Sequence, residues 1–171
     1  VTCILTAHRK TQEKAPHNRA SAEIPAVFKR IKTVIAVASG KGGVGKSTIA
    51  VNLAAALAKA GNATGLLDAD IYGPSMPHLL GIADKPQLSD DNKLIPIQAD
   101  RMHTMSIGYL VDSEQAMIWR GPKAQGALMQ MLEDVAWPDL DVLVLDLPPG
   151  TGDIQLTMAQ RIPVSGAVLV T

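Results

Sequence analysis

Residues 40–48 read Gly-Lys-Gly-Gly-Val-Gly-Lys-Ser-Thr, and this segment constrains the fold more than any other part of the chain. It fits the phosphate-binding loop pattern G-x-x-x-x-G-K-[ST], which runs here from Gly40 to Ser47. A β-branched run at 33–38 precedes the loop, and a segment rich in alanine and leucine follows it. This order of strand, loop and helix is the context in which the pattern forms a physical site.

The chemistry of such a loop depends on its main chain. Glycines let the backbone curl so that successive N–H groups face one anion, and the following helix adds its unpaired donors and the positive end of its dipole. Lys46 would reach the β- and γ-phosphates, and the Ser47 hydroxyl would bind Mg²⁺. The alternative is a glycine-rich turn that binds nothing. The nucleotide-binding residues expected here are Gly40, Lys41, Gly42, Gly43, Val44, Gly45, Lys46, Ser47 and Thr48.

Buried strands alternate with helices along the rest of the chain. Aromatic residues are only 3% of the sequence, so the core must be built from aliphatic side chains. Repeated strand–helix alternation predicts an α/β fold with a doubly wound, mainly parallel sheet, whose ligands bind at the carboxyl ends of the strands. We expect strands at 1–7, 33–38, 64–68, 103–107, 141–146 and 166–171, helices at 46–60, 121–135 and 154–161, and a surface excursion at 83–98.

The 171 residues suit a single domain preceded by a tether. Residues 8–32 are rich in Lys and Arg, contain two prolines and have few large apolar side chains, a composition typical of linkers. A solvated tether is the preferred interpretation, and a basic contact surface is the alternative. We therefore divide the chain into an N-terminal strand remnant with a basic linker at 1–32, and a phosphate-loop domain at 33–171.

Charge and cysteine content exclude several classes of protein. The formal net charge is zero, which argues against a globally basic nucleic-acid binder. Cys3 is the single cysteine, so an internal disulfide is excluded and a reducing, cytoplasmic compartment is expected. No apolar run reaches the roughly 18 residues that span a bilayer. We expect neither nucleic acid nor membrane among the partners.

A strand that ends in a carboxylate completes the expected nucleotide site. Residues 142–146 are four apolar residues followed by Asp146, the form of a Walker B strand. Asp146 would bind Mg²⁺ through water, whereas a simple turn-capping aspartate is the alternative. The loop 147–153 contains two prolines that restrict it, and we expect Gly150 to leave its backbone N–H free to sense the γ-phosphate. A plain proline turn is the alternative for this loop.

Asp68 ends the expected strand at 64–68, and Asp70 follows two residues later; together they mark a second candidate switch. We expect the two carboxylates to face different ways, with Asp70 directed at the attacking water; the alternatives are a helix cap or a carboxylate beside the metal. Lys41 is unusual because the phosphate-loop pattern does not require a lysine after its first glycine. Its ammonium could neutralise phosphate in its own subunit or across a dimer interface, and composition does not choose between them.

These motifs together resemble a known family. The segment 40–48 resembles the deviant Walker A motif of the MinD/ParA/nitrogenase iron-protein class, whose extra lysine is Lys41. The pieces Asp-Ile-Tyr-Gly-Pro-Ser and Pro-Pro-Gly-Thr-Gly-Asp are more specific, and they resemble the Mrp/ApbC family of ATP-dependent iron–sulfur cluster carriers. Residues 1–9 resemble the end of the small domain that often precedes the ATPase in bacterial members. The stretches that carry the family resemblance are 37–48, 67–77, 119–122 and 146–156.

The resemblance implies a Mg-dependent ATPase that acts as a cytoplasmic homodimer and sandwiches two ATP molecules. Lys41 of each subunit would reach the other subunit's phosphates, Lys46 and Asp70 would support hydrolysis, and Mg²⁺ would lie near Ser47 and Asp146. A bridging [4Fe–4S] cluster would pass to recipient apo-proteins. The family holds this cluster through a Cys-x-x-Cys beyond the last strand seen here, so we assign cluster carriage to a longer parent protein and expect the domain to be incomplete.

Two other functions remain open on the same fold. A MinD- or ParA-like positioning ATPase, switched by its nucleotide, would bind membrane or DNA, and the MinD-like form would carry a basic amphipathic terminal helix. A small-molecule kinase or ligase is the third candidate. A Cys-x-x-Cys following the last strand would favour the cluster carrier over both.

Overall fold

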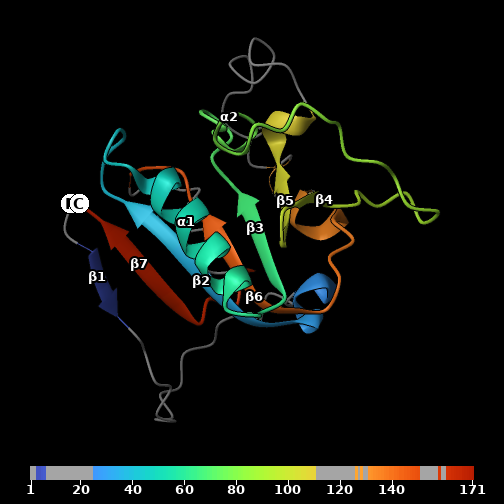
Figure 1. Cartoon of the computed structure of the whole chain (residues 1–171), viewed down its shortest axis with the longest axis horizontal. Helices are drawn as coiled ribbons and strands as arrows, with labels where there is room; N and C mark the ends of the chain where they lie inside the picture. Colours follow the sequence, from blue (N-terminus) through green and yellow to red (C-terminus); the bar gives the residue numbers. More distant parts are fainter. Residues whose placement is uncertain are drawn as a thin grey trace.

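The computed structural model describes residues 3–6, 25–110, 126, 128, 131–150, 158 and 161–171. Within these residues seven strands form one sheet in the order β1-β7-β2-β6-β3-β5-β4 (Figure 1). The strands are β1 (Cys3–Thr6), β2 (Ile31–Ser39), β3 (Thr64–Asp68), β4 (Ile97–Ala99), β5 (Met102–Ser106), β6 (Leu140–Asp146) and β7 (Gly166–Val170). The helices are α1 (Lys46–Lys59) and α2 (Met76–Leu80), with 3-10 turns η1 (Ala26–Arg30) and η2 (Ile107–Tyr109).

The centre of the sheet is parallel, as predicted. Strands β7, β2, β6, β3 and β5 run in one direction, and the two edge strands β1 and β4 are antiparallel to their neighbours. The mainly parallel α/β fold is therefore confirmed, and the strand predicted at 64–68 has those bounds in the structure. Of the two later predicted helices only some residues are described, and residues 126, 128, 131–134, 158 and 161 are helical.

The N-terminal strand belongs to the same sheet as the phosphate loop. Cys3 of β1 pairs with Val170 of β7, which places a short strand from the start of the chain at one edge. Residues 7–24 lie outside the described part of the chain. The domain boundary between residues 32 and 33 stays a prediction. However, Phe28 in η1 is buried, and β2 already begins at Ile31, because both apolar side chains join the core.

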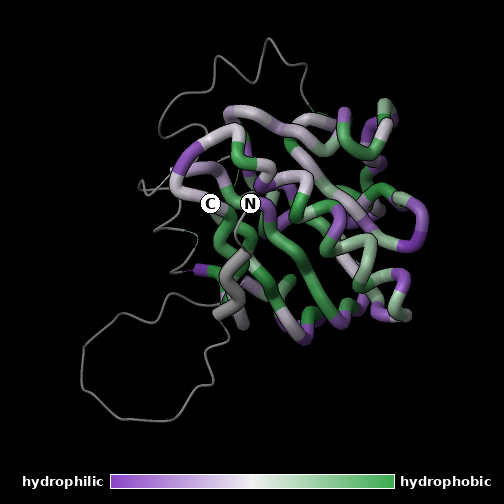
Figure 2. Tube along the Cα trace, turned by 60° about the vertical axis from the view of Figure 1, so that its left-hand side comes forward, coloured by the Kyte–Doolittle hydropathy of each residue, from purple (hydrophilic) through white to green (hydrophobic). Residues whose placement is uncertain are grey.

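The core is aliphatic, as the composition predicts. Figure 2 shows hydrophobic residues concentrated along the central strands and hydrophilic residues at many turns. Helix α1 packs on β2, β6 and β3, and it presents its alanines rather than its leucines most closely to the sheet. Ala50 and Ala54 are fully buried, whereas Leu53 is only partly buried. These small side chains let the helix lie close to the strands that carry the site.

Two local features also follow the sequence. Helix α1 stops at Gly61, whose φ of 94° is left-handed, with its N–H donating to Ala58 O at 3.0 Å and the Asn62 N–H donating to Leu57 O at 3.2 Å. The predicted excursion at 83–98 contains a small antiparallel bridge between Leu88 and Leu94 before it leads into β4. In the described part of the chain, no helix has the length and apolarity to cross a bilayer.

Candidate functional site

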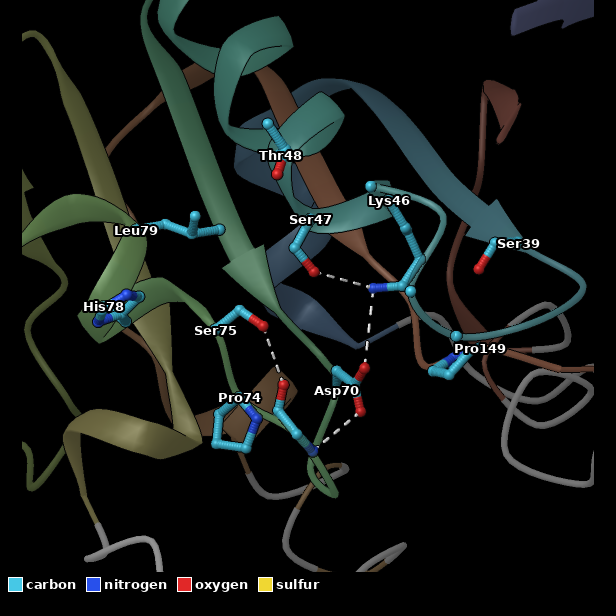
Figure 3. A pocket seen from close by; sticks show the side chains of 14 residues that line it. Ser39, Lys46, Ser47, Thr48, Asp70, Pro74, Ser75, His78, Leu79 and Pro149 are labelled. Atoms are coloured by element: carbon cyan, nitrogen blue, oxygen red, sulfur yellow. Dashed lines mark hydrogen bonds and ion pairs between the residues drawn. The ribbon is translucent and has the colours of Figure 1, made fainter. Parts of the chain in front are cut away.

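The phosphate loop lies between the carboxyl end of β2 and the start of α1. Gly43 and Gly45 have φ values of 77° and 89°, in the left-handed region that favours glycine, and Gly45 is the residue that caps α1. A cavity of about 490 Å³ opens in front of this loop (Figure 3). Its lining residues are Ser39, Gly42, Gly43, Gly45, Lys46, Ser47, Thr48, Asp70, Gly73, Pro74, Ser75, His78, Leu79 and Pro149.

Lys46 is the charge at the centre of the site. Its side chain is 7% exposed, and its ammonium donates to Asp146 Oδ1 at 2.5 Å. The same nitrogen lies 3.8 Å from Asp70 Oδ2 and donates to Ser47 Oγ at 3.3 Å (Figure 3). The structure thus brings Asp70 and Asp146, which lie far along the sequence from the phosphate loop, beside the adjacent pair Lys46 and Ser47. A lysine this deeply buried needs such partners, because an unpaired buried charge is strongly unfavourable.

Asp146 ends β6, as the Walker B pattern predicts. Its Cα is in register with Val37 on β2 and with Asp68 on β3, so it lies in the middle of the carboxyl edge of the sheet. The side chain is fully buried. One carboxylate oxygen is occupied by Lys46, whereas Oδ2 has no hydrogen-bond partner among the described residues. A buried carboxylate oxygen without a donor is a rare feature that calls for an explanation.

Asp68 and Asp70 face different ways, as expected. Asp70 lines the cavity and faces Lys46, while Asp68 is fully buried and turns toward β5. Residues two apart share a face in a regular strand, so strand alternation does not separate them. They separate because β3 ends at Asp68 and the chain turns immediately afterwards.

Burial raises the pKa of both carboxyl groups. The pKa of Asp68 rises to about 7, because burial and then the charge of Asp146 disfavour its ionised form, and hydrogen bonds from Asp70, Ser106 and Met76 oppose that rise. The pKa of Asp70 is also raised by burial, and the neighbouring ammonium of Lys46 opposes this shift. Asp70 is therefore a partly desolvated carboxyl group beside an ammonium that favours its ionised form.

The loop after β6 corrects one expectation. We expected the Gly150 N–H to be free, but it donates to Ser39 O at 2.9 Å. Gly150 has a φ of 102°, so the turn bends its N–H back toward the end of β2. The neighbouring Pro149 lines the cavity instead. A role for Gly150 in nucleotide binding stays a prediction, and residues 151–157 lie outside the described part.

Lys41 does not line the cavity of its own chain. Its side chain is exposed, it is not among the lining residues, and it forms no ion pair with the residues that the structure describes. Only its main chain is held in place, with Ser39 Oγ donating to Lys41 O at 3.0 Å. The loop therefore fixes the backbone at this position and leaves the ammonium in solvent.

One wall of the cavity was missed by sequence reasoning. Pro74, Ser75, His78 and Leu79 come from the turn before α2 and from α2 itself (Figure 3). No metal-ligand spacing in the sequence singles out His78. Its place beside the cavity depends on how the chain folds back after β3. Among the described residues, no group of three or more His, Cys, Asp and Glu side chains could hold a metal ion.

Comparison with known proteins identifies the family. The model of the family described as ParA, NUBPL iron-transfer P-loop NTPase, matches residues 30–171. The chain belongs to this family. It is 63% identical over 142 residues to the iron-sulfur cluster carrier protein of Salmonella typhimurium, covering 82% of this chain and 38% of that protein. It is 54% identical to the carrier protein of the same name from Pseudomonas fragi, covering 92% of this chain and 55% of that protein.

Solved structures agree with this placement. A nucleotide-binding protein from Archaeoglobus fulgidus, in complex with ADP, is 44% identical with a TM-score of 0.71, covering 84% of this chain and 56% of that chain. The cell division ATPase MinD of Pyrococcus furiosus has a TM-score of 0.55 at 23% identity, covering 82% of this chain and 59% of that one, a likeness of fold alone. The chain thus spans about half or less of the curated relatives named above.

Proposed function

We propose that this chain is the nucleotide-binding part of an ATP-hydrolysing iron–sulfur cluster carrier, which loads [4Fe–4S] clusters and transfers them to apo-proteins. The observation that carries the proposal is the gathering of Lys46, Asp70 and Asp146 beside the phosphate loop. Relatives at 54–63% identity that are named iron-sulfur cluster carrier proteins support the cargo. The ADP complex of the Archaeoglobus protein supports the nucleotide.

Phosphate binding would rest on the loop amides and on Lys46. Gly43 and Gly45 are left-handed and line the cavity, so the loop N–H groups would face a bound phosphate, and the first turn of α1 would add its unpaired donors. The Lys46 ammonium has three protons for bonding, which Asp146 and Ser47 engage only in part. A polyphosphate in the cavity would therefore take Lys46 as a ligand and neutralise its charge in place of Asp70.

The residues present fit a magnesium ion. Asp146 Oδ2 is buried without a donor among the described residues, and the Ser47 hydroxyl and Asp146 Oδ1 both accept hydrogen bonds from the Lys46 ammonium. Mg²⁺ prefers hard oxygen ligands and retains several waters, so one carboxylate and one hydroxyl beside a polyphosphate form a suitable set. When bound, the ion would neutralise charge that develops on the phosphates.

Asp70 is the residue that we assign to the attacking water. It lines the cavity, and its Oδ1 accepts the Gly73 N–H at 3.2 Å, which limits the rotation of the carboxylate. Burial raises the pKa of Asp70 and so makes its carboxylate a stronger base, while the Lys46 ammonium opposes that rise and favours the ionised form. A carboxylate held in this way can orient a water and accept its proton.

Two further parts of the proposal involve more than one chain. The Lys41 side chain is exposed and does not line its own cavity, so we assign its ammonium to the phosphates of a second subunit in a homodimer. Residues 4–171 contain no cysteine, and cluster ligation needs thiolates, so we place the cluster ligands outside this range.

The decisive experiment combines nucleotide and cluster measurements on the full-length protein. Calorimetry should detect binding of magnesium-complexed ATP, and hydrolysis should follow. Anaerobic reconstitution with iron and sulfide should give a [4Fe–4S] absorption spectrum and should restore an apo-enzyme that needs this cluster. Binding and hydrolysis without cluster uptake would favour a MinD- or ParA-like positioning ATPase, and no binding of any nucleoside triphosphate would refute the proposal.

Asp70→Asn tests the hydrolytic assignment. Asparagine keeps the size and one acceptor oxygen, so ATP affinity should stay within about threefold of wild type. Turnover should fall by about 10²-fold or more, the scale expected when a proton-accepting group is lost. A turnover number equal to that of wild type would show that Asp70 is structural.

Mixing two inactive variants tests whether Lys41 acts across an interface. Lys41→Ala alone and Asp70→Asn alone should each hydrolyse ATP slowly. In a mixture, a heterodimer has one site with both the intact Asp70 and the partner's intact Lys41, so part of the activity should return. If the mixture is no faster than its components, Lys41 acts within its own subunit or not at all.

A further inference from the structure

The segment from Asp70 to Met76 carries the proposed water-orienting carboxylate, yet it lies outside regular secondary structure until α2 begins at Met76. Such a segment needs contacts outside itself to hold one conformation. The hydrogen bonds that could do this converge on Asp68, a fully buried side chain that faces away from the cavity. Asp70 would contact the nucleotide, but Asp68 does not line the cavity. Asp68 therefore needs a different role.

The Asp68 carboxylate accepts four hydrogen bonds, and three come from the segment itself. Its Oδ1 accepts the Asp70 N–H at 3.0 Å. Its Oδ2 accepts the Ser75 N–H at 3.0 Å and the Met76 N–H at 3.3 Å. One side chain thus holds both ends of the turn. Hydrogen bonds to a carboxylate are stronger than those between neutral groups, so this anchor is firm when Asp68 is ionised.

The fourth bond ties the same carboxylate to the neighbouring strand. Ser106, the last residue of β5, donates its hydroxyl to Asp68 Oδ2 at 2.9 Å. The Ser106 oxygen in turn accepts the Gly108 N–H at 3.0 Å, which fixes the direction of the hydroxyl proton. Ser106 is fully buried, so water does not compete for these contacts.

Packing at Gly108 adds a steric support beneath the segment. A Cβ at this position would lie 2.8 Å from Pro77 Cγ and 3.1 Å from Pro74 Cβ. The η2 backbone therefore lies directly against the two prolines that frame Ser75. Hydrogen bonds that Asp68 accepts and close contact at Gly108 hold the segment on the same platform, which is formed by β5 and η2.

We propose that Asp68 and Ser106 form a positioning pair, which holds the Asp70–Met76 segment on β5 and so fixes where Asp70 lies at the phosphate cavity. This inference rests on the proposed function, because it assigns a role in hydrolysis to residues that touch no nucleotide. Displacing a reacting group by about 1 Å can slow a reaction by the order of 10²-fold. Loss of the pair should therefore affect turnover far more than nucleotide affinity.

The test compares Asp68→Asn and Ser106→Ala with Tyr109→Phe in the full-length protein. Tyr109→Phe is a matched control, since it removes a buried hydrogen bond between Tyr109 and Thr104 at 3.3 Å on the same platform and leaves all four hydrogen bonds to Asp68 in place. Asparagine turns an N–H₂ group toward backbone donors, so Asp68→Asn should lower kcat by about 10- to 100-fold. Ser106→Ala removes one donor of four and should lower kcat by roughly threefold to tenfold.

KM and ATP affinity should change less than about threefold, and Tyr109→Phe should leave kcat within about twofold of wild type.

Amide hydrogen exchange gives a readout that does not depend on activity. The N–H groups of Asp70, Ser75 and Met76 should exchange faster in Asp68→Asn and in Ser106→Ala, and at the wild-type rate in Tyr109→Phe. Melting curves identify any variant that fails to fold, and the milder Ser106→Ala then carries the test.

Each outcome separates the inference from the function on which it rests. Wild-type turnover in both variants, an equal loss in Tyr109→Phe, or a loss of affinity as large as the loss of kcat would overturn the positioning pair. If the wild-type protein binds no nucleotide or hydrolyses none, the proposed function fails. Exchange at the three amides still decides in that case whether Asp68 and Ser106 hold the segment.

Discussion

The two ends of the parallel sheet solve the same electrostatic problem in opposite ways. At the amino end, Arg30 pairs with Asp139 at 2.7 Å and Lys32 pairs with Asp141 at 2.8 Å, and all four side chains are at least 36% exposed. At the carboxyl end, Lys46 pairs with Asp146 at 2.5 Å, with side chains that are 7% and 0% exposed. The same strands thus carry solvated pairs at one end and a desolvated pair at the other.

This difference in exposure separates the two ends of the sheet by role: the amino end contributes to stability, and the carboxyl end holds the charges of the candidate site. Exposed pairs contribute little, since water and salt screen them, whereas a buried pair is costly to form and more costly to break. The amino end is built instead by packing, where Trp137, Leu140 and Leu143 surround Gly65. The carboxyl end holds its charges in a low-dielectric setting, where they act most strongly on a charged substrate. Three substitutions test this division.

Lys46→Ala should have the largest effect, because it removes the cation of the buried ion pair at the carboxyl end of the sheet. It leaves Asp146 and Asp70 buried without a cation, so unfolding free energy should fall by about 3–5 kcal/mol. ATP binding should disappear in calorimetry. The double variant Lys46→Met with Asp146→Leu should regain much of the stability, measured by denaturant unfolding, but no binding. Retained ATP affinity in Lys46→Ala would contradict the assignment of the phosphate site.

Gly65→Ala should have an intermediate effect that is confined to stability. The new Cβ would lie 2.7 Å from Leu140 Cδ1 and 2.9 Å from Leu143 Cδ1, so packed side chains would have to move. Overpacking of this kind costs about 1–3 kcal/mol. Denaturant unfolding should show that loss while ATP affinity stays at the wild-type value. A change in ATP affinity would show that the two ends are coupled.

Asp141→Asn should have the smallest effect, visible mainly in its dependence on pH. The pKa of Asp141 is lowered, first by the hydrogen bond from Lys32 and then by the one from Ala63. Its contribution to stability is therefore present above the unfolded value of 3.8 and is lost as the pH falls through the lower folded value. The pKa of Lys32 is raised, so its contribution is present below 10.5 and is lost as the pH rises through the folded value. Melting temperatures of the two proteins should thus differ by a small, constant amount between about pH 5 and 9, and high salt should reduce it. A difference that varies steeply near neutral pH would point to another group.

Sequence reasoning succeeded where the signal is local. The phosphate loop, the strand ending in Asp146 and the stop at Gly61 follow from glycine positions and apolar runs, which act within a few residues. It also expected Asp68 and Asp70 to face different ways, although strand alternation gives no reason for that. The turn directly after β3 does.

It failed where a residue depends on a distant neighbour. The partner of the Gly150 N–H is Ser39, more than a hundred positions away, and nothing in the proline-rich loop announces it. Ser106 reaches Asp68 only because β5 lies beside β3, and a lone serine at a strand end carries no pattern. Pairing of β1 with β7 joins the first strand to the last, a contact that sequence alone does not specify.

Ser39 has a consequence for how the two nucleotide-facing loops behave. Its hydroxyl holds the main chain at Lys41, and its carbonyl holds the Gly150 N–H. The last residue of β2 therefore contacts both loops. If the turn that follows β6 moves, either the hydrogen bond to the Ser39 carbonyl breaks or the end of β2 moves with the turn. Movement of one loop is therefore coupled to movement of the other through Ser39, a residue that also lines the cavity.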